Sequence, residues 1–416
     1  MQFERREAEA ALFLATQTLS LSFAVSVRLR GPLAQGQLEG ALAGLGRRHP
    51  TLAVRAAARD DGTAYFTDEG VPPVSLLVAD RTGDDDWVAA VERAIEQRTP
   101  YLQGPFVRCV WLRGPDVSDL ILICDHLTGD GRAAVYALSD LLESLADPAR
   151  IIEALPVPQP LHELVPADVA RQIIEDAADL PPAQNRRRTA PANPADSDAS
   201  APAMPAAPRS PARIRPFSLT IDETAALVAR SRAEGVTVQA AMCAAFLTPF
   251  AEADPDRPLR RVEIPVDLRP KLTRATEGEF RNAVGLAQVE VDCTPGRNLW
   301  DVARDAARAL ANIRHRDAFA TPAVVMPLTG RWPKAPWDIN YDISISNLGR
   351  LDLPESFGEL TLESIYGPIF PATGPKHLIL GISTFGGQLR CTFSSRAADA
   401  PPAFDRGREL IRLMLG

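Results

Sequence analysis

The sequence predicts an α+β fold in which two mixed layers of sheet and helix form two lobes. At 416 residues the chain exceeds the size at which a single hydrophobic core stops growing. Segments with strand periodicity alternate with segments of helical periodicity in both halves. Residues 181–212 separate the halves and contain eight prolines and ten alanines. We therefore expect a first lobe over residues 1–180, a solvated linker over 181–212 and a second lobe over 213–416.

The first half reads as strands that alternate with amphipathic helices. Residues 23–29 place apolar side chains at every second position, which is the period of a half-buried strand. Leu38, Leu42 and Leu45 recur at helical spacing before Pro50 ends that helix. The same reasoning predicts further helices over 6–18, 85–97, 133–146 and 167–179, and further strands over 52–56, 63–67, 74–79, 107–112 and 120–124.

The second half repeats this mixture of elements. Asp222 and Thr237 are suited to cap the helices that follow them, because a short polar side chain can accept from free backbone amides there. Gly386–Gly387 is typical of a hairpin turn between two strands. We predict helices over 222–233, 237–251, 298–314 and 402–415, and strands over 214–221, 260–267, 286–292, 339–345, 358–366, 377–385 and 388–395.

Composition narrows the classes of function. A net charge of −8 argues against nucleic acid as the main partner. The five cysteines are scattered without CxxC spacing, so we expect neither disulfides nor a metal site. No leader-like segment opens the chain and no apolar run reaches the length of a membrane span. These features favour a cytoplasmic protein without a membrane span, which we expect to be a monomer.

The stretch Leu120–Leu145 carries the most chemical information in the chain. An apolar strand enters the polar turn HLTGDG, which begins at His126, and an amphipathic helix leaves it. Histidine titrates near neutral pH and can remove a proton from an alcohol or amine. Asp130 could accept from the start of the helix or pair with a distant cation. A structural histidine is the alternative, but the strand before His126 and the helix after it favour a functional site.

At this turn the sequence resembles a known superfamily. Asp125–Gly131, DHLTGDG, is similar to the HHxxxDG signature of condensation domains, whose superfamily includes chloramphenicol acetyltransferase, polyketide-associated acyltransferases and alcohol acetyltransferases. The resemblance continues in family order along nearly the whole chain outside the linker. It is carried by segments at Leu38–Pro50, Gly104–Arg108, Val266–Pro270, Asn282–Gly285 and Ser346–Arg350.

The resemblance implies a fold and a reaction. It implies two chloramphenicol acetyltransferase-like lobes that form a V with a tunnel between them. His126 would act in the tunnel as general base, with direct acyl transfer, no acyl-enzyme and no permanently bound cofactor. The co-substrate would be a thioester of coenzyme A or of the phosphopantetheine on an acyl carrier protein. The acceptor would be a small-molecule alcohol or amine.

The same resemblance assigns supporting roles to residues around the base. Asp130 would form a salt bridge, for which Arg269 in the DLRP segment is the candidate, although a solvated arginine is the alternative. Gly131 would leave room for the pantetheine arm. The His126 loop backbone, or Ser383 and Thr384, could donate to the developing oxyanion. Asp125 and Asn347 are further candidates for the tunnel or the oxyanion site.

Two departures from the family pattern matter. Asp125 replaces the first histidine of the signature, and an anion beside the base can raise its pKa. The family's DFGWG segment is absent, and SNLGR stands in its place, which favours a stand-alone acyltransferase over an assembly-line condensation domain. Asn347 in that segment is either a residue that shapes the tunnel or an ordinary turn residue.

Three functions remain in competition at this point. We favour an acyltransferase of natural product biosynthesis that acts on a secondary metabolite or lipid, with O-acylation preferred over N-acylation. A non-catalytic module that recruits a carrier protein is the second, supported by Asp125 and the long linker. A free-standing, amide-forming condensation enzyme is the third.

Overall fold

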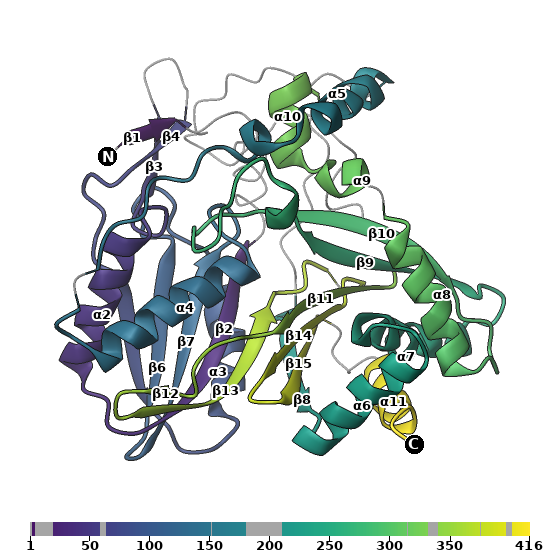
Figure 1. Cartoon of the computed structure of the whole chain (residues 1–416). Coiled ribbons are helices and arrows are strands. Elements are labelled where there is room, and N and C mark those ends of the chain that lie inside the picture. Colours follow the sequence, from purple (N-terminus) through teal and green to yellow (C-terminus); the bar gives the residue numbers. More distant parts are fainter. Residues whose placement is uncertain are drawn as a thin grey trace.

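The computed structural model describes most of both halves of the chain. The described residues are 2–4, 20–58, 64–150, 152–179, 210–313, 315–331, 340–374, 376–396 and 402–416. The helix expected over 6–18, the linker segment up to residue 209 and the first position of the strand expected from Ile339 lie outside them. Figure 1 shows two lobes side by side, each with its own sheet, that meet along their inner strands.

The first lobe is built on a six-stranded sheet. The strands lie in the order β12 (Ser356–Phe357), β13 (Leu360–Ile369), β2 (Ser22–Arg30), β7 (Val117–Asp125), β6 (Val107–Arg113) and β5 (Ser75–Asp80). Helices α2 (Gln35–Arg48) and α4 (Gly131–Ala146) lie on one face and α3 (Asp86–Glu96) on the other. A small three-stranded sheet combines β1 (Gln2–Glu4), β4 (Ala64–Thr67) and β3 (Arg55–Ala58).

The second lobe repeats the arrangement with another six-stranded sheet. Its strands lie in the order β10 (Val284–Asp292), β9 (Leu259–Asp267), β11 (Ile343–Arg350), β14 (Ile379–Phe385), β15 (Gln388–Ser395) and β8 (Arg213–Ser218). The covering helices are α6 (Ile221–Ala233), α7 (Val238–Ala253), α8 (Leu299–Ala311) and α11 (Pro402–Leu413). The α+β class and the two-lobed architecture are therefore confirmed.

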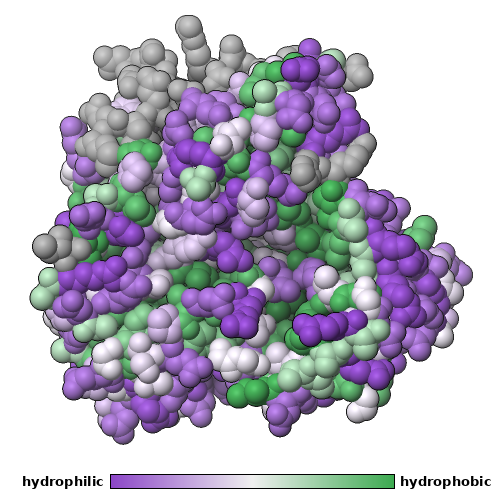
Figure 2. Space-filling view, viewed as in Figure 1, coloured by the Kyte–Doolittle hydropathy of each residue, from purple (hydrophilic) through white to green (hydrophobic). Residues whose placement is uncertain are grey.

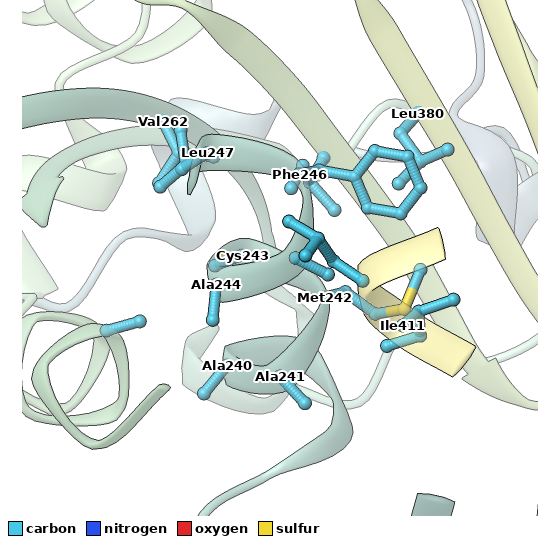
Figure 3. Close-up of a cluster of buried hydrophobic side chains, with 14 of the residues drawn as sticks. Ala240, Ala241, Met242, Cys243, Ala244, Phe246, Leu247, Val262, Leu380 and Ile411 are labelled. Carbon is cyan, nitrogen blue, oxygen red and sulfur yellow. The ribbon is translucent and has the colours of Figure 1, made fainter. Parts of the chain in front are cut away.

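The core of the second lobe explains why α7 is apolar on all sides. Ala240, Met242, Phe246 and their neighbours are fully buried between the sheet and α11, against Leu380 and Ile411 (Figure 3). A helix that is hydrophobic all round belongs in the interior of a domain. Within the described residues no single helix is long and apolar enough to cross a membrane, although the bent pair α6 and α7 would pass by length and composition together.

One crossover between the lobes was not predicted. β13 comes from the second half of the chain, yet it pairs antiparallel with β2 of the first sheet, for example Ile365 with Val27. The strand periodicity of β13 was recognised, but period alone does not say which sheet a strand joins. After β11 of the second sheet, the chain therefore adds β12 and β13 to the first sheet and then returns to the second sheet with β14 (Figure 1).

Short helices cap the upper end of the molecule in Figure 1. They are α5 (Ala167–Asp176), α9 (His315–Phe319) and α10 (Pro322–Thr329). Their apolar side chains form a separate cluster with Leu268 and Ala283, which both come from the second half. Neither α9 nor α10 was predicted from the sequence. The cluster anchors the two segments, around Leu268 and Ala283, that reach the HLTGDG turn.

The strand expected over 52–56 is wrong at its start. Leu52 donates from its backbone amide to the carbonyl of His49, so residues 50–53 form a turn and β3 begins only at Arg55. Pro50 stops α2, and the chain uses this turn to reverse before it can pair with β4.

Candidate active site

The HLTGDG turn is held in shape mainly by its own backbone and by Asp130. The amides of Thr128 and Gly129 both donate to the carbonyl of Asp125, each at 3.1 Å. Asp130 is the N-cap of α4, and its Oδ1 accepts from the amide of Ala133 at 2.9 Å. A short acidic residue suits this position because the free amides of the first helical turn need an acceptor. The turn therefore begins at a buried strand end and finishes on a capped helix.

The expected ion pair between Asp130 and Arg269 is present. Arg269 Nη1 lies 3.0 Å from Asp130 Oδ2, and Nη2 lies 3.0 Å from Oδ1, so the pair is bidentate. Only 3% of the Arg269 side chain and 4% of the Asp130 side chain are exposed. Burial raises the pKa of Asp130, but the Arg269 charge and the hydrogen bonds outweigh it and the pKa is lowered. The solvated arginine considered as an alternative is excluded.

A segment of the second half closes on the turn from the other side. The amide of Ala283 donates to Asp130 Oδ2 at 2.8 Å, and Arg269 Nη2 donates to the carbonyl of Arg281 at 3.0 Å. Asn282 Nδ2 donates to the carbonyl of His126 at 2.8 Å. The sequence had marked this segment only as similar to the superfamily, and it gave no signal of these contacts. Each lobe therefore contributes to the position of His126.

Phe280 fills the space beside Gly129. A Cβ built on Gly129 would lie 2.2 Å from Cε1 of the fully buried Phe280 ring. The Phe280 carbonyl also accepts from Thr51 Oγ1 of the first lobe at 2.8 Å. The glycine at position 129 is required by this ring, because any side chain there would push Phe280 away from the turn.

The His126 ring lies between two aromatic rings. It stacks on Phe370 at a centroid distance of 4.9 Å and an interplanar angle of 15°, and Phe23 lies at 4.6 Å. Phe370 directly follows β13, and Phe23 lies on β2. The pairing of β13 with β2 therefore places both aromatic rings beside His126. Nothing in the sequence had indicated Phe370. The two rings fix the plane of the imidazole while His126 as a residue stays half-buried.

The surroundings of His126 favour its neutral form. Removal of water around the imidazole lowers the pKa below its ordinary value, while the carboxylates of Asp130 and Asp125 act in the opposite direction. A backbone hydrogen bond with Gly129 also raises the pKa, as expected of a carbonyl that accepts from the ring. In a neutral imidazole that donates from one nitrogen to this carbonyl, the other nitrogen is an acceptor.

The Asp125 carboxylate is held by Thr99, Tyr101 and the backbone of Leu127. Its Oδ2 accepts from Thr99 Oγ1 at 2.6 Å and from Tyr101 Oη at 2.8 Å, and its Oδ1 accepts from the amide of Leu127 at 2.9 Å. All three contacts use the carboxylate as acceptor, so Asp125 does not suit the oxyanion role considered for it, and its place in the tunnel stays a prediction. Position 125 is fully buried.

Gly131 contacts the second half of the chain. A Cβ at this position would lie 3.1 Å from Pro368 Cβ and 3.2 Å from Leu348 Cδ2. The neighbouring Arg132 donates from Nη2 to the carbonyl of Leu348 at 2.8 Å. The glycine thus allows the SNLGR strand to approach the start of α4. Its expected role in leaving room for a pantetheine arm stays a prediction.

The remaining candidates lie on β11 and β14. Asn347 Oδ1 accepts from the amide of Gly349 at 2.8 Å beside an irregularity in β11, which matches the turn role considered for it. Ser383 is fully buried and donates from Oγ to the carbonyl of Ile365 at 3.2 Å. Thr384 pairs through its backbone with Arg350. Oxyanion roles for Ser383 and Thr384 stay predictions, and the one for Ser383 requires its present hydrogen bond to break.

A metal site requires several liganding side chains close together. Among the described residues no group of three or more histidine, cysteine, aspartate or glutamate side chains could hold a metal ion. Cys124 precedes the turn on β7, is 1% exposed, and burial raises its pKa well above that of an ordinary thiol. The reactive potential of the site therefore rests on His126.

Comparisons with known proteins find a family model that matches the second half of the chain. Residues 208–393 match the family model described as phthiocerol/phthiodiolone dimycocerosyl transferase C-terminus. The match includes Arg269, the segment around Asn282 and the SNLGR strand, but not the HLTGDG turn. No curated protein sequence matches the chain significantly.

Solved structures show the fold of the whole chain. Polyketide synthase associated protein 5 from Mycobacterium tuberculosis is 16% identical with a TM-score of 0.67, over 99% of this chain and 98% of that one. The first condensation domain of the CDA synthetase is 14% identical with a TM-score of 0.67, over 100% and 95%. The trichothecene 15-O-acetyltransferase TRI3 from Fusarium sporotrichioides is 12% identical with a TM-score of 0.68, over 100% and 94%. Family model and fold together support an acyltransferase or condensation-like function.

Proposed function

We propose that this chain, whose fold is similar to that of condensation domains and a polyketide synthase associated protein, transfers an acyl group from a thioester to a hydroxyl group with His126 as general base. The observation that carries the proposal is the state of His126. It is a half-buried imidazole with a lowered pKa, on a turn fixed from both lobes. Figure 2 shows that the face of the molecule is hollowed between the lobes, with hydrophobic and hydrophilic residues side by side.

The reaction needs one proton to move twice. The free ring nitrogen of His126 removes the proton of the acceptor hydroxyl as its oxygen attacks the thioester carbonyl. The tetrahedral intermediate then collapses, the carbon–sulfur bond breaks, and the imidazolium returns the proton to the leaving thiolate. Ester and free thiol are the products, and His126 ends as it began. No enzyme nucleophile takes part.

The charges around the base suit the middle of this reaction. While the intermediate exists, His126 is positively charged, and the carboxylates of Asp130 and Asp125 both favour that form. Arg269 holds the Asp130 carboxylate in one orientation through two hydrogen bonds. Because these groups are placed before the substrate arrives, little reorganisation opposes proton transfer.

The donor and the acceptor are proposed from chemistry and from the relatives. A coenzyme A or carrier-bound phosphopantetheine thioester is the donor, because a neutral imidazole base requires an already activated acyl group. A hydroxyl acceptor on a secondary metabolite or lipid is supported by the transferase family model and by the fold of TRI3, whose name specifies O-acetylation. Amide formation is the second candidate, supported by the fold of the condensation domain.

A donor screen tests the proposal. The purified chain is mixed with acyl-coenzyme A of increasing chain length and with the matching acyl-carrier thioesters, and thiol release is followed with a pool of alcohols, a pool of amines or no acceptor. We expect release that depends on the alcohol pool. Release that depends only on amines supports the condensation alternative, and carrier binding without turnover of any donor supports a non-catalytic module.

A further inference from the structure

We propose that Asp125 is a positioning residue for the base, whose carboxylate fixes the backbone of the turn around His126. The inference rests on the proposed function of His126 and deepens it. Asp125 stands where the superfamily signature has its first histidine, so its role cannot be taken from that signature. The contacts of its carboxylate supply the role instead.

One carboxylate oxygen of Asp125 connects the residues on either side of His126. Asp125 precedes His126, and its Oδ1 accepts from the amide of Leu127, which follows it, at 2.9 Å. The main-chain carbonyl of Asp125 accepts from the amides of Thr128 and Gly129. Asp125 therefore receives three of the backbone amides of the turn. An aspartate that accepts from the amide two residues ahead is a common device for holding a turn.

The other carboxylate oxygen is tied to a different part of the lobe. Thr99 Oγ1 and Tyr101 Oη donate to Oδ2 at 2.6 Å and 2.8 Å. Both donors lie between α3 and β6, and they are 4% and 8% exposed. Tyr101 packs edge to face on Phe106 at 5.4 Å, which fixes its ring. The carboxylate thus links a rigid, buried anchor to the backbone of the turn.

The negative charge of Asp125 also affects the pKa of His126. The carboxylate is among the groups that raise the pKa of His126, against the loss of water that lowers it. The nearby Arg108 also interacts with this charge, but its guanidinium donates to the carbonyls of Ala94 and Gln97, at 2.6 Å and 2.7 Å. Asp125 therefore acts on His126 in two separable ways, through the hydrogen bond to Leu127 and through its charge.

Two substitutions separate these effects. Asp125→Asn keeps an oxygen that can accept from Leu127 but removes the negative charge. Asp125→Ala removes both. Asp119→Asn is the matched control, because Asp119 lies on the same strand, is 1% exposed and loses a charge in the same way, while its ion pairs are with Arg28 and Arg81.

The experiment uses the full chain with labelled histidines, and it needs no substrate. NMR titration of the imidazole signals gives the pKa of His126, assigned by the signal that His126→Gln removes, and amide hydrogen exchange reports on Leu127. We expect Asp125→Asn to lower the pKa of His126 by about half a unit or more, because an anion is lost nearby. We expect Asp119→Asn to leave it unchanged. Asp125→Ala should also speed exchange at Leu127 by about tenfold or more.

Either half of the inference can fail on its own. Unchanged exchange at Leu127 in Asp125→Ala overturns the positioning role, and an unchanged His126 pKa in Asp125→Asn overturns the electrostatic role. If Asp125→Ala does not fold, Tyr101→Phe and Thr99→Val each remove one donor to Oδ2 and should still speed exchange at Leu127. A chain that transfers no acyl group refutes the proposed function but leaves these outcomes readable.

Discussion

Two half-buried histidines, His126 and His377, differ in the charges that act on their imidazoles. Burial lowers the pKa of both side chains. At His377 the positive charge of Arg396 lowers it further, to about 4. At His126 the carboxylates of Asp130 and Asp125 oppose the effect of burial. Burial beside a cation therefore favours the neutral imidazole at His377, whereas the carboxylates near His126 favour uptake of a proton there.

The contacts of the two rings agree with this difference. His377 Nδ1 is engaged by Thr373, whose amide and Oγ1 lie 3.0 Å and 2.7 Å away, and the ring meets Tyr341 edge to face at 5.9 Å. The His126 ring instead stacks on Phe370 and lies beside Phe23. His377 therefore serves as a structural acceptor in the connection between β13 and β14, and it provides an internal reference for His126.

The largest expected effect is a difference in acyl-transfer rate between the His126 and His377 variants. His126→Ala should lower the rate of acyl transfer by about 10²- to 10⁴-fold, the usual contribution of a general base. His377→Ala should change it by less than about tenfold, because it removes only a structural hydrogen bond. Thiol release with the donor found in the screen measures both, and circular dichroism checks the fold. A His126→Ala enzyme that keeps more than a tenth of the rate contradicts the role of His126.

The next effect is the loss of stability when the Asp130 carboxylate loses its partner Arg269. Arg269→Ala leaves Asp130 buried without its cation, which should reduce the free energy of unfolding by about 3–5 kcal/mol. Arg406→Ala is the control, because Arg406 pairs bidentately with Glu252 at the surface and the loss should be about 1 kcal/mol or less. Denaturant unfolding measures both. Equal losses in the two variants would show that burial of the Asp130 pair has no special importance.

A smaller effect is expected from Gly129. Gly129→Ala forces the Phe280 ring aside and should cost about 1–3 kcal/mol of unfolding free energy. Gly40→Ala is the matched control within α2, where a Cβ has open space and alanine should stabilise by about 0.5–1 kcal/mol. Adding Phe280→Leu to Gly129→Ala should recover part of the loss. A harmless Gly129→Ala would mean that Phe280 does not fix the turn.

The last effect is the pH dependence of stability at His377. Its pKa is about 4 in the folded chain and about 6.5 when unfolded, so below pH 6.5 the unfolded form binds the extra proton. Stability should fall as the pH drops from about 6.5 to about 4. His377→Gln should make that fall shallower. Unfolding curves at several pH values measure the slope, and identical slopes in both proteins would refute the low pKa of His377.

The sequence predicted those features of the site that depend on neighbouring residues. It predicted fewer of the contacts between residues far apart in the sequence. The capped turn and His126 follow from residues that are neighbours in sequence. The partner of Asp130 was found through the DLRP resemblance, because an aspartate alone does not name its cation. Phe280 and Phe370 were missed, since an aromatic residue in a loop has no local signature of what it packs against. Gly131 was recognised as a letter of the motif, but its neighbours Leu348 and Pro368 depend on how the second half folds back.

The fold shows the same division. Strand and helix periods located most elements of both sheets, because period depends only on which side chains are buried. The pairing of β13 with β2 was not predictable, since both candidate sheets offer strands of suitable length. α9 and α10 are too short for a helical period to be read in the sequence.

The most direct test of His126 as a neutral base is the pH dependence of kcat/KM, measured with the donor found in the screen and compared with the NMR titration of the His126 imidazole. We expect the rate to fall on the acid side with a pKa below 6.5 that equals the pKa of His126, because protonation removes the base. A rate that falls with a pKa different from that of His126, or that stays constant through it, would contradict the mechanism.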